Sequence, residues 1–230
     1  MLTLFHHIMS SSSRAIRLIL YEFNMSLTLV EEHEWARRQE FLQLNPAGSV
    51  PVLLNEHSQA ISGAYSIIEY LDETIGLLNK DNNFFPKSPI ERAEIRRLIS
   101  WFLEKFNYET TYPIVRQRIY KREMPTSLGG GAPDSTILRA ARNNIKPHME
   151  YLNWLTQNNN CLASSTLSYA DFAAAACVSI LDYMDEIDWA AYGYAKQWYM
   201  RIKSRPSMRP ILFDRVAGLA PSTYYTSLDF

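Results

Sequence analysis

The residues with the clearest chemical potential in this sequence are four consecutive serines, Ser10 to Ser13, which precede a stretch with helical periodicity. A serine hydroxyl near the start of a helix can donate a hydrogen bond to a thiolate and lower its pKa, and the helix dipole adds to that effect. The candidates for such a thiolate site are Ser10, Ser11 and Ser12. Serine is also among the most favoured helix N-caps, so Ser12 or Ser13 could equally cap the helix. The run by itself leaves both interpretations open.

A second candidate for ligand binding is Pro51, which lies inside the predicted strand formed by residues 50–54. Proline cannot donate to a strand ladder, so its presence indicates a sheet edge or an unusual geometry. A helix is predicted to begin shortly after Gly63 and Ala64, and its free backbone N–H groups would favour a negatively charged ligand.

We expect no metal site. Cys161 and Cys177 form no CxxC motif and show no metal-ligand spacing. His6 and His7 are adjacent on a predicted strand, so their side chains point to opposite faces of the sheet. Packing or solvation is the simpler role for both histidines.

The elements that must position these groups form an α/β unit followed by an all-helical unit. Alternating and helical periodicities predict strands at 2–7, 27–30, 50–54 and 60–61, and helices at 14–23 and 65–71. The first strand, helix and strand make a right-handed unit with parallel strands. We therefore predict one domain over residues 1–80 and a second over residues 88–230.

The second domain contains only helices. A capping box at Ser88 predicts a long helix that Pro113 kinks or breaks. Pro147 is expected to bend the next helix. A second capping box at Ser168 precedes the apolar run 173–180, which indicates a helix buried in a bundle. Residues 216–230 are rich in turn formers and are expected to cover the surface as a tail.

Three motifs, at residues 10–17, 45–53 and 168–171, resemble those of the cytosolic glutathione S-transferases in order and separation. The resemblance covers the whole chain and implies a glutathione S-transferase (GST) fold, with a thioredoxin-like N-terminal domain built on a mixed four-stranded sheet and a helical-bundle C-terminal domain. It implies that Val50-Pro51 is cis, which turns the Val50 backbone outward to pair with the cysteine of glutathione. A homodimer is expected for this fold and for soluble oligomers in general.

One departure from the family pattern concerns glutathione itself. A Glu/Gln-Ser pair holds the γ-glutamyl group in this family, and the corresponding positions here are Gly63 and Ala64. Hydrogen bonds to charged groups contribute ~1.5–3 kcal/mol each, so losing two weakens binding by roughly 10²- to 10⁴-fold. We expect no required cofactor and at most weak glutathione binding.

Segments in the C-terminal half, at 181–183, 198–199, 201–207 and 225–230, resemble a narrower alphaproteobacterial group of this family. Members of that group bind the tubulin-like division protein FtsZ and assist constriction. The resemblance implies a non-catalytic adaptor at the division site. The alternative is a glutathione-dependent transferase or peroxidase with a thiolate-stabilising serine.

Two residues are candidates for contact with FtsZ. Trp35 follows a charged segment, and exposed tryptophan is enriched in interface hot spots. Half-burial against Phe41 is the structural alternative. Asp229 lies in a tail that Tyr224 and Tyr225 could dock on the helical domain, although terminal residues are commonly disordered and tolerant of change.

The composition limits the other possibilities. The formal net charge of -1 gives the chain no general attraction to nucleic acid or to an anionic membrane. No apolar run approaches the ~20 residues that span a bilayer, and the N-terminus lacks the features of a signal peptide. These observations favour a cytoplasmic protein that does not insert into membranes.

Overall fold

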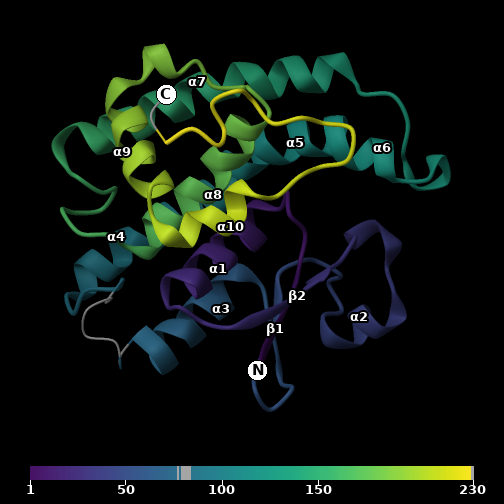
Figure 1. Cartoon of the computed structure of the whole chain (residues 1–230), viewed down its shortest axis with the longest axis horizontal. Coiled ribbons are helices and arrows are strands. Elements are labelled where there is room, and N and C mark those ends of the chain that lie inside the picture. The colour runs from purple at the N-terminus through teal and green to yellow at the C-terminus, as the bar shows by residue number, and fades with distance from the viewer. Residues whose placement is uncertain (77, 79–83, 229–230) are drawn as a thin grey trace.

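The chain was analysed as a computed structural model, which describes residues 1–76, 78 and 84–228. An α/β unit at the N-terminal end of the chain packs against a larger group of helices (Figure 1). The predicted boundary between domains, about residues 81 to 88, lies partly outside the described residues.

The N-terminal unit contains one mixed sheet. Its strands are β1 (Leu2–His6), β2 (Leu27–Glu31), β3 (Val52–Leu54) and β4 (Ala60–Ser62), in the order β2-β1-β3-β4. Strand β1 is parallel to β2 and antiparallel to β3, which is antiparallel to β4. The prediction of a mixed four-stranded sheet is confirmed. Pro51 directly precedes β3 rather than lying within it, so its missing N–H breaks no ladder bond.

Helices α1 (Ser11–Glu22) and α3 (Ala64–Leu71) supply apolar side chains to the core beside the sheet. Between β2 and β3 the chain forms a 3₁₀ turn (Glu34–Ala36) and the short helix α2 (Gln39–Leu44). This connection carries Trp35 past the end of the sheet.

The helical unit begins with one long helical run. It consists of α4 (Pro89–Ser100), a π-helical segment (Trp101–Thr111), α5 (Tyr112–Val115), a second π-helical segment (Arg116–Tyr120) and α6 (Lys121–Glu123). Of the two outcomes expected at Pro113, a kink or a break, the break is wrong: the run continues, and the hydrogen-bond ladder changes to π-helical turns on both sides of α5. The run begins at Pro89 as predicted, but Ser88 makes no side-chain capping bond.

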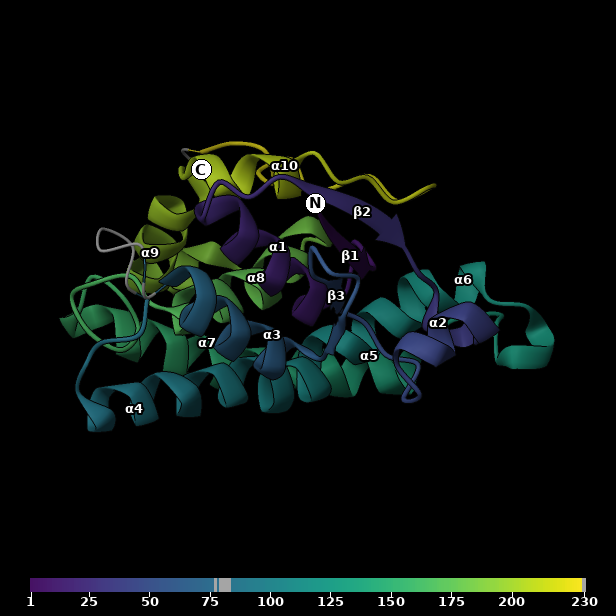
Figure 2. The ribbon, with the colours of Figure 1, turned by 90° about the horizontal axis from the view of Figure 1, so that it is seen from below.

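The other helices of this unit are α7 (Ser135–Asn158), α8 (Tyr169–Tyr183), α9 (Gly193–Lys203) and α10 (Arg209–Leu212). Helix α7 continues through Pro147. The capping box of Ser168 and Asp171 is present, and every residue of α8 is buried, as predicted. Figure 2 shows α8 between the other helices and α1, and α1 packs directly on it.

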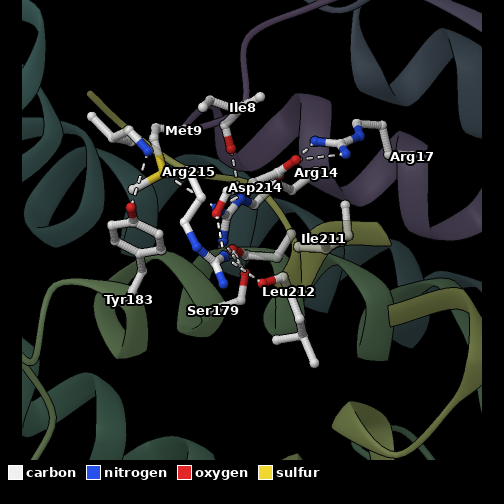
Figure 3. Close-up of polar contacts among 12 residues, drawn as sticks. Ile8, Met9, Arg14, Arg17, Ser179, Tyr183, Ile211, Leu212, Asp214 and Arg215 are labelled. Atoms are coloured by element: carbon white, nitrogen blue, oxygen red, sulfur yellow. Dashed lines mark hydrogen bonds and ion pairs between the residues drawn. The ribbon is translucent and has the colours of Figure 1, made fainter. Parts of the chain in front are cut away.

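A buried arginine joins the two units. The Arg14 side chain is fully buried; its Nε donates to the carbonyl of Ile8 at 2.6 Å, and its Nη1 donates to Ser179 Oγ at 2.9 Å and to Tyr225 Oη at 3.2 Å. Figure 3 shows this group beside Arg17, which pairs with both carboxylate oxygens of Asp214 at 2.7 and 2.9 Å. Helices α1 and α8 and the C-terminal segment therefore meet at one polar centre.

The C-terminal segment is docked on the helices, as expected (Figure 1). Tyr225 is completely buried and donates to the carbonyl of Ile211 at 3.1 Å, whereas Tyr224 is 55% exposed. Two arginines near α6 bond to other segments: Arg122 donates to the carbonyl of Gly218 in the C-terminal segment, and Arg118 pairs at 2.8 Å with Glu186, just beyond α8. These cations hold the fold together.

We predict that Asp214→Asn destabilises the protein by about 3–5 kcal/mol, because it leaves the buried Arg17 and its neighbour Arg14 without a counter-charge. Urea unfolding measures the change. Glu150→Gln, which removes an exposed pair with Lys146, is the control and should change stability by less than about 1 kcal/mol. Equal effects of the two substitutions would contradict a structural role for the centre.

Candidate functional site

The serine run lies at the start of α1, where the structure separates the four hydroxyl groups. Ser10 is the N-cap and accepts a hydrogen bond from the Ser13 N–H at 3.3 Å, so the expectation that Ser12 or Ser13 caps the helix is wrong. Ser11 is buried and donates to Asn107 Oδ1 at 2.9 Å. Ser12 is partly exposed and makes no side-chain hydrogen bond within the described residues. Of the three thiolate candidates, Ser11 donates within the chain, whereas the hydroxyl protons of Ser10 and Ser12 have no acceptor among the described residues.

The peptide bond between Val50 and Pro51 is cis, as the resemblance implied. The Val50 N–H, which that resemblance assigns to the cysteine of glutathione, donates instead to Glu34 Oε1 at 2.9 Å. A carboxylate of the same chain therefore occupies the acceptor position of the ligand. Sequence analysis missed Glu34, because it lies 16 residues from Val50 with no periodic relation to it.

The Glu34 carboxyl is partly buried, and this desolvation raises its pKa although the Val50 N–H opposes the change. No arginine or lysine of the described chain forms an ion pair with it. The contact with Val50 is thus the main stabilising interaction of this carboxylate. A glutathione molecule would have to displace it before pairing with the strand.

Gly63 and Ala64, at the start of α3, offer no side-chain hydrogen bond, as their residue types indicated. Gly63 is the N-cap with a φ of 87°, and Ala64 is buried. The Gly63 N–H donates to the carbonyl of Pro51 at 3.0 Å, so it is also engaged within the chain. A side chain at Gly63 would be strained by the positive φ, although the space beside it is open. Only Ala64 can be changed without backbone strain.

Trp35 follows Glu34 on the same 3₁₀ turn and is half-buried. Its ring centroid lies 4.7 Å from that of His33, 4.9 Å from that of Tyr120 and 6.1 Å from that of His7. The half-burial given as the alternative for Trp35 is confirmed, but its partner is wrong: Trp35 packs against the main core, whereas Phe41 lies in a separate cluster with Phe5. Trp35 therefore covers a polar aromatic cluster beside the closed ligand position. The other partner candidate, Asp229, lies outside the described residues.

The histidines at the end of β1 are both buried. Burial lowers the pKa of His6 to about 4 and that of His7 to about 3, and nearby positive groups contribute in both cases. The Nδ1 atom of His7 accepts a hydrogen bond from the Met9 N–H at 3.1 Å. Both side chains are therefore neutral at neutral pH.

Comparison with known proteins also gives the glutathione S-transferase fold. Residues 9–74 match the family model described as "Glutathione S-transferase, N-terminal domain". The structure superimposes on the crystal structure of a glutathione S-transferase from Sinorhizobium meliloti with a TM-score of 0.98 and 51% identity, covering 100% of both chains. The chain belongs to the glutathione S-transferase family.

Within the family, the chain is similar to a protein named for the division apparatus. It is 38% identical over 231 residues to FtsZ-localized protein A of Caulobacter vibrioides, covering 99% of this chain and 98% of that one. The solved structure titled "FzlA from C. crescentus" superimposes with a TM-score of 0.90 at 38% identity, covering 100% of this chain and 99% of the other.

We predict that Glu34→Ala strengthens glutathione binding by roughly tenfold or more, because it frees the Val50 N–H for the ligand. Adding Ala64→Ser should strengthen it further by supplying a hydroxyl at the start of α3. Glu34→Gln keeps an acceptor for Val50 and should have a smaller effect. Calorimetric titration measures all four proteins. A parent dissociation constant well below about 1 mM would contradict the closed site.

We also predict that His7 lowers the stability of the folded protein at acidic pH. Its pKa is about 3 in the folded protein and 6.5 in the unfolded chain, so the unfolded state binds more protons between these values and stability falls as pH falls below 6.5. In His7→Asn the amide oxygen can still accept from Met9, but the group no longer titrates. The pH dependence of the unfolding free energy between pH 6.5 and 5 should decrease, by at most about 1.4 kcal/mol per pH unit. If the unfolding free energy of His7→Asn, measured with urea, changes with pH as steeply as that of the parent protein, the prediction is refuted.

Proposed function

We propose that this chain is a GST-fold adaptor that binds FtsZ at the division site and assists constriction without requiring glutathione. The proposal is carried by one observation, the hydrogen bond from the Val50 N–H to Glu34. That bond uses the backbone group on which thiol recognition by this fold depends. Similarity to FtsZ-localized protein A over nearly the full length supplies the partner.

The site retains some features of an enzyme and lacks others. Ser12 at the start of α1 is free to approach a thiol, whereas Gly63 and Ala64 offer only backbone groups. A glutathione-dependent transferase or peroxidase is therefore the second candidate, supported by the hydroxyl groups of Ser10 and Ser12. Turnover of glutathione with a model electrophile that Ser12→Ala abolishes would favour this candidate over the adaptor.

We extend the proposal to the oligomeric state and the cellular location of the protein. We propose a two-fold homodimer, the commonest arrangement among soluble oligomers, which sedimentation velocity tests directly. We propose that it acts in the cytoplasm, where FtsZ polymerises. Among the described residues no helix is both long and apolar enough to cross a bilayer.

We predict that Trp35→Ala reduces co-sedimentation with polymerised FtsZ, with an affinity loss of at least ~30-fold if the indole is an anchor. Trp154→Ala on α7 is the matched control, because it removes a tryptophan that is 59% exposed. Trp35→Phe keeps an aromatic ring over His33 and Tyr120 and separates loss of contact from loss of packing. Parent-like sedimentation of a well-folded Trp35→Ala protein would exclude this residue as an anchor.

A further inference from the structure

A cavity of about 350 Å³ opens beside Trp35, between the end of the sheet and the C-terminal segment. Its walls include two carboxylates, Glu31 at the end of β2 and Glu123 at the end of α6. Neither forms an ion pair with an arginine or lysine of the described chain; the imidazole rings of His7 and His33 lie close to Glu123, with His7 Nε2 4.0 Å from Glu123 Oε2. Desolvation raises the pKa of Glu123 and the charge of Glu31 adds to that rise, whereas His33 and the more distant Arg122 oppose it.

The chain's own cation at this cavity does not neutralise these carboxylates. Arg215 lines the cavity, but its Nη1 donates to the carbonyls of Leu212 and Asp214, both at 2.7 Å. His7 adds no positive charge at neutral pH, because burial lowers its pKa to about 3. Glu31 and Glu123 thus lie on one concave surface. The guanidinium of Arg215 beside them donates to backbone carbonyls.

A histidine ring with an unpartnered nitrogen also lines the cavity. His33 lines it, and His33 Nδ1 is buried without a hydrogen-bond partner in the described part of the chain. The Trp35 indole forms an adjacent wall. A planar guanidinium donates hydrogen bonds in several directions and stacks on aromatic rings. A site with carboxylates, a ring nitrogen and an aromatic wall therefore suits a guanidinium.

A metal ion is the other occupant to consider, because ligand atoms of His7, His33 and Glu123 lie within 4.8 Å of one another. The hydrogen bond from the Met9 N–H fills the Nδ1 lone pair of His7. The proton of this neutral imidazole is therefore on Nε2, the atom that faces Glu123. A ring nitrogen that carries its proton has no lone pair to offer a metal, so His7 in this tautomer is not a ligand.

We propose that this cavity is a socket for an arginine side chain of the protein partner, held by Glu31 and Glu123 against Trp35. The inference rests on the proposed function, since it specifies how the partner would be recognised. It also gives Trp35 a role as one wall of a charged pocket.

The test uses the full chain with polymerised FtsZ. Glu31→Gln with Glu123→Gln should weaken co-sedimentation by about tenfold or more and reduce its salt dependence. Glu56→Gln with Glu73→Gln makes the same change in net charge at two exposed carboxylates elsewhere and should bind like the parent. Thermal unfolding verifies that each variant is folded. Parent-like binding by the first pair would overturn the proposal.

A second measurement identifies the occupant without FtsZ. N-acetyl-arginine amide should perturb the Trp35 indole resonance of the labelled protein, whereas the uncharged citrulline analogue should not. Equal responses to the two probes would overturn the proposal, and so would stoichiometric zinc binding that His33→Ala abolishes. If the parent protein binds the arginine probe and the Glu123→Gln protein does not, the socket is supported. If that same parent protein fails to sediment with FtsZ, the proposed partner is rejected.

Discussion

The structure depends on the burial of Arg14. A guanidinium cannot leave water unless its donors find acceptors, and here these come from the loop before α1, from α8 and from the C-terminal segment. Asp214 supplies the neighbouring negative charge, which it shares with Arg17. Arg14 therefore has all of these acceptors only when the two units and the C-terminal segment pack together.

This centre also fixes the place of the ligand site. Because Arg14 lies one turn into α1, the start of that helix is held against the helical unit, where Ser11 donates to Asn107. The docked C-terminal segment brings Arg215 and Val216 to the cavity beside Trp35. The same interactions that join the domains thus shape the surface that we assign to the partner.

The family fold is retained here, and the Val50 N–H at its ligand position is bonded within the chain. The cis bond before Pro51 and the helix start at Ser11 keep the geometry of a thiol site. Glu34 then fills the backbone position that a peptide ligand would use, and Gly63 leaves the start of α3 without a side chain. A closed ligand site beside an acidic cavity is consistent with a protein whose surface, rather than its catalytic chemistry, carries the function.

The sequence by itself determined what depends on local periodicity and short motifs: the four strands, the buried helix α8, its cap at Ser168 and the missing ligands at Gly63 and Ala64. Only the tertiary structure decided contacts between distant residues. The pairing of Glu34 with Val50, and the meeting of His7, His33 and Glu123, leave no trace in periodicity because each partner comes from a different element. Local propensity likewise does not predict that the helix continues through Pro113 with π-helical turns on both sides of α5, since proline lacks the N–H that a regular ladder needs.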